Sequence, residues 1–205
     1  QGSSELNISV VIKRKDEIRA LRAIHDEFFS ETTTINLIQV GVGVIGKELL
    51  TQIKENQKSL LQKQNLNIRV IAIVNSKKML IDPDGIDLEN WQTKLGDCNY
   101  DADLPGLINT VNNINLTDCV FVDCTASEEV SQMYDTALSN RISVVTANKI
   151  ANTGSYQVYK QLNDLSDQYN VHYLYETTAG AGLPIIDTIK NLLDSGDQIL
   201  KLEAI

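Results

Sequence analysis

From residue 34 onward the sequence alternates between short apolar runs and longer amphipathic stretches, and this alternation restricts the fold more than any other feature. The apolar runs have the length and β-branched composition of buried strands. They span 34–40, 67–74, 119–125, 141–148 and 171–177. The stretches at 44–64, 127–140 and 155–169 have helical spacing. Strands that alternate with helices form parallel βαβ units, so the sequence predicts an α/β fold with a doubly wound parallel sheet.

The remaining segments give weaker signals. Residues 6–12 are typical of a strand, residues 16–29 of a helix, and residues 81–110 of irregular chain with short helices. A further helix is expected at about 184–194 and a strand at 198–205. A strand and a helix are too little to fold alone, so the N-terminal segment is expected to be the tail of a preceding domain. Together with the strand-like C-terminal end, this suggests an excised piece of a longer polypeptide.

Composition excludes several function classes. The net charge of −9 argues against nucleic acid or an anionic membrane surface as the main partner, although backbone amides can still bind a phosphate. None of the three cysteines forms a CxxC pair, which argues against a zinc site and favours reduced thiols in the cytoplasm. No apolar run has the length of a membrane span.

A glycine motif follows the first apolar strand. Gly41, Gly43 and Gly46 form G-x-G-x-x-G between that strand and a long helix, as phosphate binding by a Rossmann-type domain requires. The first glycine permits the tight turn, the second lets the backbone approach a pyrophosphate, and the third lets helix and strand pack closely. We therefore expect the turn to bind a dinucleotide through Gly41, Val42, Gly43, Val44, Ile45 and Gly46.

The end of the second strand distinguishes NADP from NAD. An Asp or Glu there accepts hydrogen bonds from the ribose 2′-hydroxyl of NAD, whereas this chain has Asn75, Ser76, Lys77 and Lys78. A hydroxyl and an ammonium group attract a 2′-phosphate, so Asn75, Ser76 and Lys77 predict NADP(H), with NAD(H) tolerated. The alternative is that both lysines are only solvated surface charges.

Three further strand ends carry candidate residues. Thr125 ends the third strand and Ala126 follows it; Thr125 is placed to contact a nicotinamide, or else Thr125 or Ser127 merely caps a helix. Lys149 follows the fourth strand, where it reaches the nicotinamide ribose or a substrate carboxylate, or is a surface charge. The loop from Glu176 to Pro184 offers one carboxylate and several carbonyls, which suit a hard cation, although a plain turn is the simpler interpretation.

These motifs, in this order and spacing, resemble homoserine dehydrogenases. The matching segments are GVGVIG, IVNSKKML, VDCTAS, TANK and YETTAGAGLPII, while QGSSELNISVVI with its following helix resembles the end of an aspartokinase ACT region. The chain is thus similar to the bifunctional aspartokinase–homoserine dehydrogenases over essentially its whole length. The resemblance implies NAD(P)H-dependent reduction of L-aspartate 4-semialdehyde to L-homoserine, in threonine and methionine biosynthesis.

The resemblance also implies domains and residue roles. Residues 1–31 would end the ACT region and its linker, 32–178 form the NAD(P)-binding Rossmann domain, and 179–205 begin a truncated substrate and dimerisation domain. Lys149 would contact the cofactor and lie near the substrate, which makes it the one catalytic candidate. A sodium ion would be held by Glu176, Ala179, Ala181 and Leu183.

The family's substrate-binding acids and proton-donating lysine lie beyond Ile205. Because carbonyl reduction needs an acid, these 205 residues alone are expected to bind cofactor without turnover, and the full-length protein to be a homo-oligomer. One alternative is another amino-acid or semialdehyde dehydrogenase, in which Cys124 would be the nucleophile. The other is a non-catalytic module that senses the cofactor.

Overall fold

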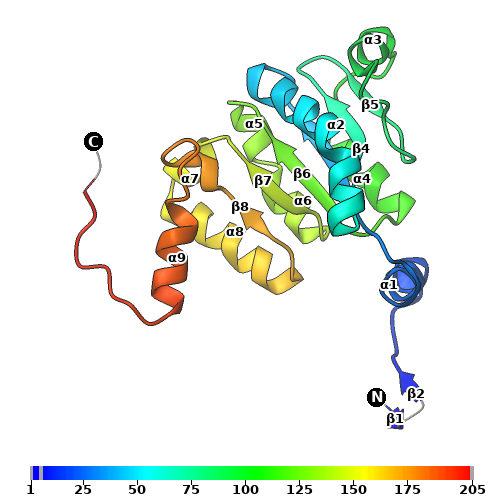
Figure 1. The fold of residues 1–205 in the computed structure, drawn as a ribbon, viewed down its shortest axis with the longest axis horizontal. Helices are drawn as coiled ribbons and strands as arrows, with labels where there is room; N and C mark the ends of the chain where they lie inside the picture. Colours follow the sequence, from blue (N-terminus) through cyan, green and yellow to red (C-terminus); the bar gives the residue numbers. More distant parts are fainter. Residues whose placement is uncertain (1, 5–6, 204–205) are drawn as a thin grey trace.

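The computed structural model describes residues 2–4 and 7–203, and its centre is a six-stranded sheet with helices on both faces (Figure 1). The strand order is β5-β4-β3-β6-β7-β8. All neighbours in this sheet are parallel except β5, which pairs with β4 antiparallel. The chain enters at β3, moves outward through β4 to β5, and then crosses back to β6 on the other side of β3. The predicted doubly wound sheet is confirmed, with an added antiparallel edge strand.

The sheet is built from these elements in chain order. The strands are β3 (Thr33–Val40), β4 (Leu66–Val74), β5 (Met79–Ile81), β6 (Cys119–Asp123), β7 (Ser143–Thr146) and β8 (Tyr173–Leu174). The helices are α2 (Val44–Gln64), α3 (Trp91–Asp97), α4 (Leu104–Ile114), α5 (Glu128–Ser131), α6 (Tyr134–Ser139), α7 (Ile150–Thr153) and α8 (Tyr156–Tyr169). A 3₁₀ turn, η2 (Glu176–Thr178), and α9 (Ile186–Asp194) follow β8.

Two apolar cores lie on opposite faces of the sheet. One core joins the strands to α2 and α3 through Leu50, Ile53, Trp91 and Leu95. The other core joins them to α4, α6 and α8 through Leu107, Ile108, Tyr134, Leu138 and Leu162. Alternate residues of one strand serve different cores: Phe121 of β6 packs into the second core and Val122 into the first. Burial on both faces explains why the strands are nearly continuous apolar runs.

The N-terminal segment lies to one side of this sheet (Figure 1). It comprises β1 (Gly2–Ser4), β2 (Asn7–Ser9), the 3₁₀ turn η1 (Arg14–Asp16) and α1 (Glu17–Phe29), with β1 and β2 paired antiparallel. On α1, the apolar side chains of Ile18, Leu21, Ile24 and Phe28 are all more than half exposed. Large apolar side chains on one helix at this spacing normally face a core, so α1 leaves an apolar face uncovered here.

Several predicted elements differ from the structure. The strand expected at 6–12 is limited to β2 within the described residues, because 10–13 leave the pairing; residue 6 lies outside them. The helix expected at 127–140 is two helices, α5 and α6. The region 81–110 contains α3 and most of α4, and β5 just before it was not predicted.

The last two strands predicted along the chain also differ from the structure. The strand expected at 171–177 shortens to the two residues of β8, because the chain turns into η2. The strand expected at 198–205 is wrong over 198–203, where the chain forms no strand, and residues 204 and 205 lie outside the described part. Among the described residues, no helix combines the length and apolarity needed to cross a membrane.

Candidate functional site

The glycine turn joins β3 to α2 at the point where the sheet reverses its strand order. Neighbouring strands β3 and β6 lead to connections on opposite sides here, and open α/β sheets bind ligands outside the carboxyl ends of such strands. The backbone amide of Gly41 donates to the carbonyl of Val74, 2.9 Å away, and the Cys124 amide donates to Val40 at the same distance. These bonds fix the turn between the ends of β4 and β6.

The three glycines of the turn meet different surroundings. Gly41 has φ +91°, and a Cβ there would lie 2.6 Å from Cγ2 of Thr125. A Cβ on Gly46 would lie 2.0 Å from the Gly41 carbonyl oxygen. A Cβ on Gly43 would meet nothing within 4 Å. Two glycines are therefore required by packing, whereas Gly43 faces open space that a ligand can fill.

The first turn of α2 presents unsatisfied amides beside that space. Its N-cap is Gly43, which has no side chain to accept from them, and Lys47 is the first residue whose amide bonds within the helix, to the Gly43 carbonyl. The side chains of Val44 and Ile45 are 88% and 59% exposed. Uncapped amides at the positive end of a helix bind a phosphate, so this geometry fits the pyrophosphate of a dinucleotide.

The side chain of Gln39 stabilises the glycine turn by a hydrogen bond, and sequence analysis did not single this residue out. This residue is fully buried in β3, and its Nε2 donates to the Gly41 carbonyl over 2.9 Å. A glutamine inside an apolar strand breaks the pattern, and that break is the signal that could have drawn attention to it.

The end of β4 forms a tight polar turn. Oδ1 of Asn75 accepts the backbone amides of Lys77 at 2.8 Å and of Lys78 at 2.7 Å. Lys78 is held in place, because its Nζ donates to the carbonyl of Gly96 in α3. Ser76 and Lys77 are exposed. Asn75 therefore shapes the turn, and Ser76 with Lys77 are the groups presented to solvent beside the phosphate turn.

A buried polar cluster links the ends of β6 and β7. Asp123 is fully buried; its Oδ1 accepts the Thr125 amide at 2.7 Å, and its Oδ2 accepts the Tyr134 hydroxyl at 2.6 Å and Asn148 Nδ2 at 3.0 Å. Burial and the neighbouring Asp123 charge raise the pKa of Tyr134 far above its ordinary value, so this tyrosine stays a hydroxyl donor. Sequence analysis did not single out Tyr134, because its position in a helix indicated only core packing.

Thr125 and Lys149 lie on the two loops that this cluster joins. Oγ1 of Thr125 accepts the Ser127 amide at 3.1 Å, and Ser127 in turn caps α5 through the Val130 amide. The helix cap is therefore made by Ser127 and not by Thr125, whose methyl group lies against Gly41. Ala126 is exposed on the same loop, and Lys149 is exposed at the start of α7.

Cys124 lies under the phosphate turn and is not activated. Burial raises the pKa of its thiol, and only a hydrogen bond with Gln39 opposes this rise. Neither histidine of the chain is among the causes of that shift. A nucleophilic cysteine needs a lowered pKa or an adjacent base, so the geometry does not favour the alternative in which Cys124 attacks a substrate.

The candidate cation loop follows η2. Oε1 and Oε2 of Glu176 accept the amides of Ile186 at 2.9 Å and Asp187 at 2.8 Å, at the start of α9. Burial alone would raise the pKa of Glu176, but these amides lower it overall. Ala181 has φ +53°, and the Leu183 carbonyl accepts the Ile185 amide at 2.9 Å. Glu176 is thus first of all a cap of α9, and a cation would have to share its carboxylate; Ala179 lies directly after η2.

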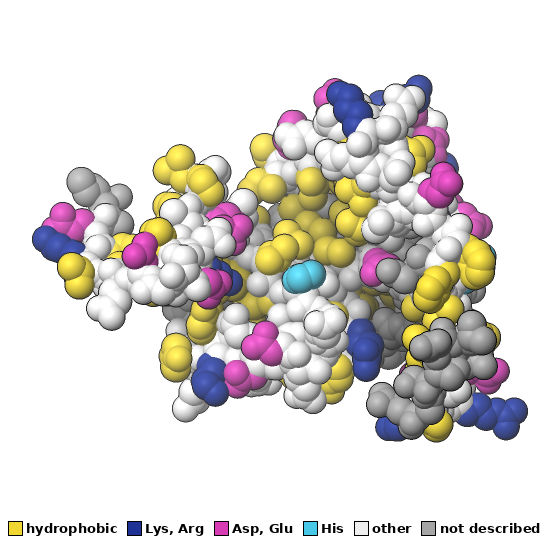
Figure 2. Space-filling model, turned by 60° about the horizontal axis from the view of Figure 1, so that its bottom comes forward, with side chains coloured by type: hydrophobic (Ala, Val, Ile, Leu, Met, Phe, Trp, Pro, Cys, Tyr) yellow, Lys and Arg dark blue, Asp and Glu magenta, His cyan; other side chains and the backbone are white. Residues whose placement is uncertain are grey.

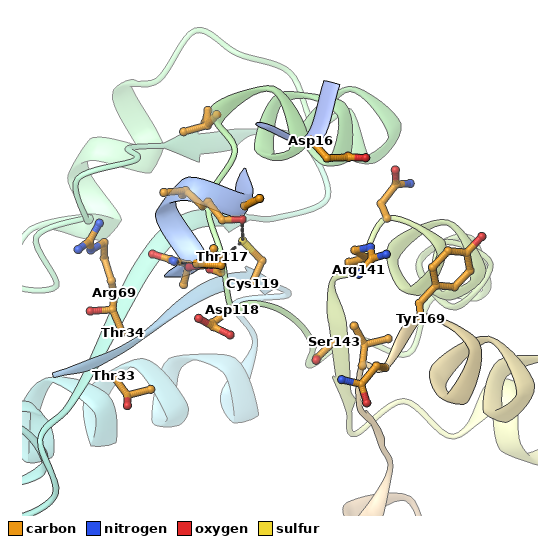
Figure 3. Close-up of a pocket in the computed structure, with 18 of the residues that line it drawn as sticks. Asp16, Thr33, Thr34, Arg69, Thr117, Asp118, Cys119, Arg141, Ser143 and Tyr169 are labelled. Carbon is orange, nitrogen blue, oxygen red and sulfur yellow. Dashed lines mark hydrogen bonds between the residues drawn. The ribbon is translucent and has the colours of Figure 1, made fainter. Parts of the chain in front are cut away.

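A hollow of about 1800 Å³ lies at the opposite edge of the sheet (Figure 3). It is lined by the starts of strands, including Thr33, Cys119 and Ser143, and by Asp16 at the N-terminal segment. Charged residues of both signs surround it, and Figure 2, which brings this side forward, shows acidic and basic side chains scattered over the surface. This edge carries the amino ends of the strands, so it is not where a parallel sheet binds a nucleotide.

Comparison with known proteins agrees with this geometry. Residues 41–176 match the family model "Homoserine dehydrogenase, NAD binding domain", and residues 1–28 match an ACT domain model. The chain is 44% identical to the chloroplastic bifunctional aspartokinase/homoserine dehydrogenase 2 of Arabidopsis thaliana and 40% identical to the bifunctional enzyme of Haemophilus influenzae. Each match covers 100% of this chain but only 22% and 25% of the relative, respectively. The chain therefore spans about a quarter, or less, of the length of these relatives.

Solved structures show the same fold. A hyperthermophilic archaeal homoserine dehydrogenase in complex with NADPH superposes with a TM-score of 0.64 at 28% identity, over 79% of this chain and 50% of that one. The homoserine dehydrogenase of Thermoplasma acidophilum gives a TM-score of 0.60 at 22% identity, over 79% and 49%. The family match covers the phosphate turn, the ends of β4, β6 and β7, and the start of η2. By that match, this chain belongs to the homoserine dehydrogenase family and contains its NAD-binding domain.

Proposed function

We propose that this chain is the nucleotide-binding part of a bifunctional aspartokinase–homoserine dehydrogenase that reduces L-aspartate 4-semialdehyde to L-homoserine with NADPH. The observation that carries the proposal is the open space at Gly43, flanked by the uncapped amides of α2. A turn with no ligand has no need of such a space, and a helix end without a capping side chain is otherwise costly.

Residues around the turn would hold the cofactor. Gly41, Val42, Gly43, Val44, Ile45 and Gly46 would bind the pyrophosphate, Asn75, Ser76 and Lys77 the 2′-phosphate, and Thr125, Ala126 and Lys149 the nicotinamide half. When bound, the nicotinamide supplies a hydride to a carbonyl carbon. Lys149, exposed at the start of α7, provides a positive charge that would orient the substrate carboxylate.

The preference for NADPH follows from charge. No carboxylate ends β4, and Lys77 is exposed there while Lys78 is held by Gly96. A 2′-phosphate would therefore meet one free ammonium group and the Ser76 hydroxyl rather than a negative charge. The solved relative in complex with NADPH is consistent with this proposal.

We also propose a sodium ion at the loop after η2, held by Glu176 and the carbonyls of Ala179, Ala181 and Leu183. A carboxylate with backbone carbonyls is a hard oxygen donor set that suits such an ion. Its role would be to brace the junction near residue 178, where the nucleotide-binding domain of 32–178 meets the segment 179–205. Residues 1–31 would belong to the ACT region, in line with the ACT domain match over 1–28.

The proposal is tested by assaying the full-length protein and the 205-residue chain separately. The full-length protein should oxidise L-homoserine with NADP⁺, and the 205-residue chain should bind NADPH but show no turnover. Turnover by this chain alone would contradict the assignment of the acids to sequence beyond it. Failure of the full-length protein to oxidise homoserine, with NADPH still bound, would favour a cofactor-sensing module or another dehydrogenase. We further expect a cytoplasmic homo-oligomer; native mass measurement tests the oligomer.

A further inference from the structure

The ends of β6 and β7 are joined by a closed ring of hydrogen bonds around a buried carboxylate. The Asn148 backbone amide donates to Thr146 Oγ1 over 2.9 Å, and Thr146 Oγ1 lies 2.7 Å from the Tyr134 hydroxyl. Tyr134 donates to Asp123 Oδ2, which also accepts Asn148 Nδ2. Asn148 thus enters the ring twice, once through its backbone and once through its side chain.

The direction of each bond in the ring is fixed. The Thr125 amide and Asn148 Nδ2 can only donate, so the Asp123 oxygens act as acceptors. Tyr134 then gives its single proton to Asp123, and its oxygen accepts the proton of Thr146. Asp123, Tyr134, Thr146 and Asn148 are all at most 2% exposed, so water does not replace these bonds. Breaking one of them would leave an unpaired buried group.

Asn148 also uses the rest of its side chain. Its Nδ2 donates to the Ser127 carbonyl over 2.8 Å, and its Oδ1 accepts the Ile150 amide at 3.1 Å. One amide group thereby ties the start of α7 to the loop after β6. Lys149 lies between Asn148 and Ile150, and the Thr125 amide is bound to the same carboxylate. The two candidate cofactor contacts, Lys149 and Thr125, are therefore both positioned by the same buried group of hydrogen-bonded side chains around Asp123.

We propose that Asn148 is a positioning residue, which sets the place of Lys149 relative to Thr125 through the ring around Asp123. The inference rests on the proposed function, because it takes Lys149 and Thr125 as contacts of the nicotinamide half. Asn148 itself is 2% exposed and touches no ligand in this scheme. Replacing Asn148 should therefore affect the reaction through Lys149. If Asn148 had only a structural role, the effect of replacing it would not depend on Lys149.

The test is a double-mutant cycle in the full-length protein with Asn148→Ala and Lys149→Ala. With Lys149 present, Asn148→Ala should lower kcat/KM for homoserine about tenfold or more; with Lys149→Ala, the further loss should be under about twofold. An equal loss in both backgrounds overturns the proposal. Asn152→Ala is the matched control, because Asn152 lies in α7 and binds the Tyr173 hydroxyl outside the ring. It should change kcat/KM by less than about twofold.

Two further measurements keep the proposal testable. If Asn148→Ala does not fold, Tyr134→Phe takes its place: it removes the two hydroxyl bonds to Asp123 and Thr146, keeps the aromatic side chain, and should show the same dependence on Lys149. If the unaltered full-length protein does not oxidise homoserine, the proposed function fails. The coupling through the ring is then tested separately, by measuring amide hydrogen exchange in the 205-residue chain. Asn148→Ala should then speed exchange at the Thr125 and Ile150 amides together, while faster exchange at Ile150 alone would overturn the coupling.

Discussion

We expect the same substitution, glycine to alanine, to have opposite consequences at Gly43 and at Gly46, although both residues lie in one motif. Alanine at Gly46 would place a Cβ 2.0 Å from the Gly41 carbonyl oxygen and 2.8 Å from Gln39 Nε2. The first of these atoms is backbone, so the turn itself must shift. Overpacking of this kind costs about 3 kcal/mol at the upper end of its range, and the better helix propensity of alanine offsets about 1 kcal/mol. We expect a net loss of about 2 kcal/mol of unfolding free energy.

Alanine at Gly43 would meet nothing within 4 Å, and the backbone there has φ −71°, which any residue adopts. The free energy of unfolding should change by less than about 1 kcal/mol, the cost of a poorer N-cap. The methyl group would instead occupy the space meant for the pyrophosphate. Loss of one charge-assisted hydrogen bond, worth about 1.5–3 kcal/mol, weakens NADPH binding on the order of 10- to 100-fold.

Thermal unfolding and NADPH fluorescence titration of the two variants check this contrast. For a chain of this size, about 2 kcal/mol corresponds to a decrease in Tm of about 4–8 °C for Gly46→Ala. Gly43→Ala should keep a near-native Tm and lose affinity. Unchanged NADPH affinity in Gly43→Ala would refute the assignment of that space to the cofactor, and an unchanged Tm in Gly46→Ala would refute the packing argument.

Three further predictions concern single side chains. Lys77→Ala should weaken NADPH binding about tenfold without affecting NADH, measured by parallel titrations; Lys78→Ala, which breaks the contact with Gly96, should lower Tm instead. Alkylation with iodoacetamide at neutral pH should leave homoserine oxidation intact, because the raised pKa keeps Cys124 a thiol; rapid inactivation, absent in Cys124→Ala, would contradict this. Since the pKa of Glu176 is lower in the folded chain, its contribution to stability is present above its ordinary pKa of 4.5 and lost as pH falls through the folded value. Glu176→Gln should flatten that part of a Tm-against-pH curve.

Local signals were sufficient for much of the fold. The helix at 44–64 and the first strand agree with α2 and β3 within a residue or two, because burial on both faces gives the strand its apolar residues Leu37, Ile38 and Val40 and the glycine turn marks the boundary. The split of the helix at 127–140 was not predictable in this way. Residues there keep an amphipathic pattern across the break, which falls at Gln132, the C-cap of α5, and Met133, the N-cap of α6.

For the candidate site, the sequence indicated residues at the strand ends but not the hydrogen bonds that connect them. The residue types at the ends of β4, β6 and β7 pointed to loops at one edge of the sheet, because parallel strands bring their carboxyl ends to one edge. The bonds from Asn148 to Asp123 and Ser127, which are 25 and 21 positions away in sequence, depend on the register between β6 and β7 and on side-chain direction. A pattern of residue types contains neither quantity.

Backbone bonds already join the carboxyl ends of four strands into one edge. The Gly41 amide donates to the carbonyl of Val74, the last residue of β4; the Cys124 amide donates to Val40, the last of β3; and the Ala147 amide donates to Asp123, the last of β6. The loops after β3, β6 and β7 therefore each begin with their first amide fixed to the neighbouring strand. Because an edge fixed in this way needs little ordering when a ligand binds, binding energy is not spent on shaping it.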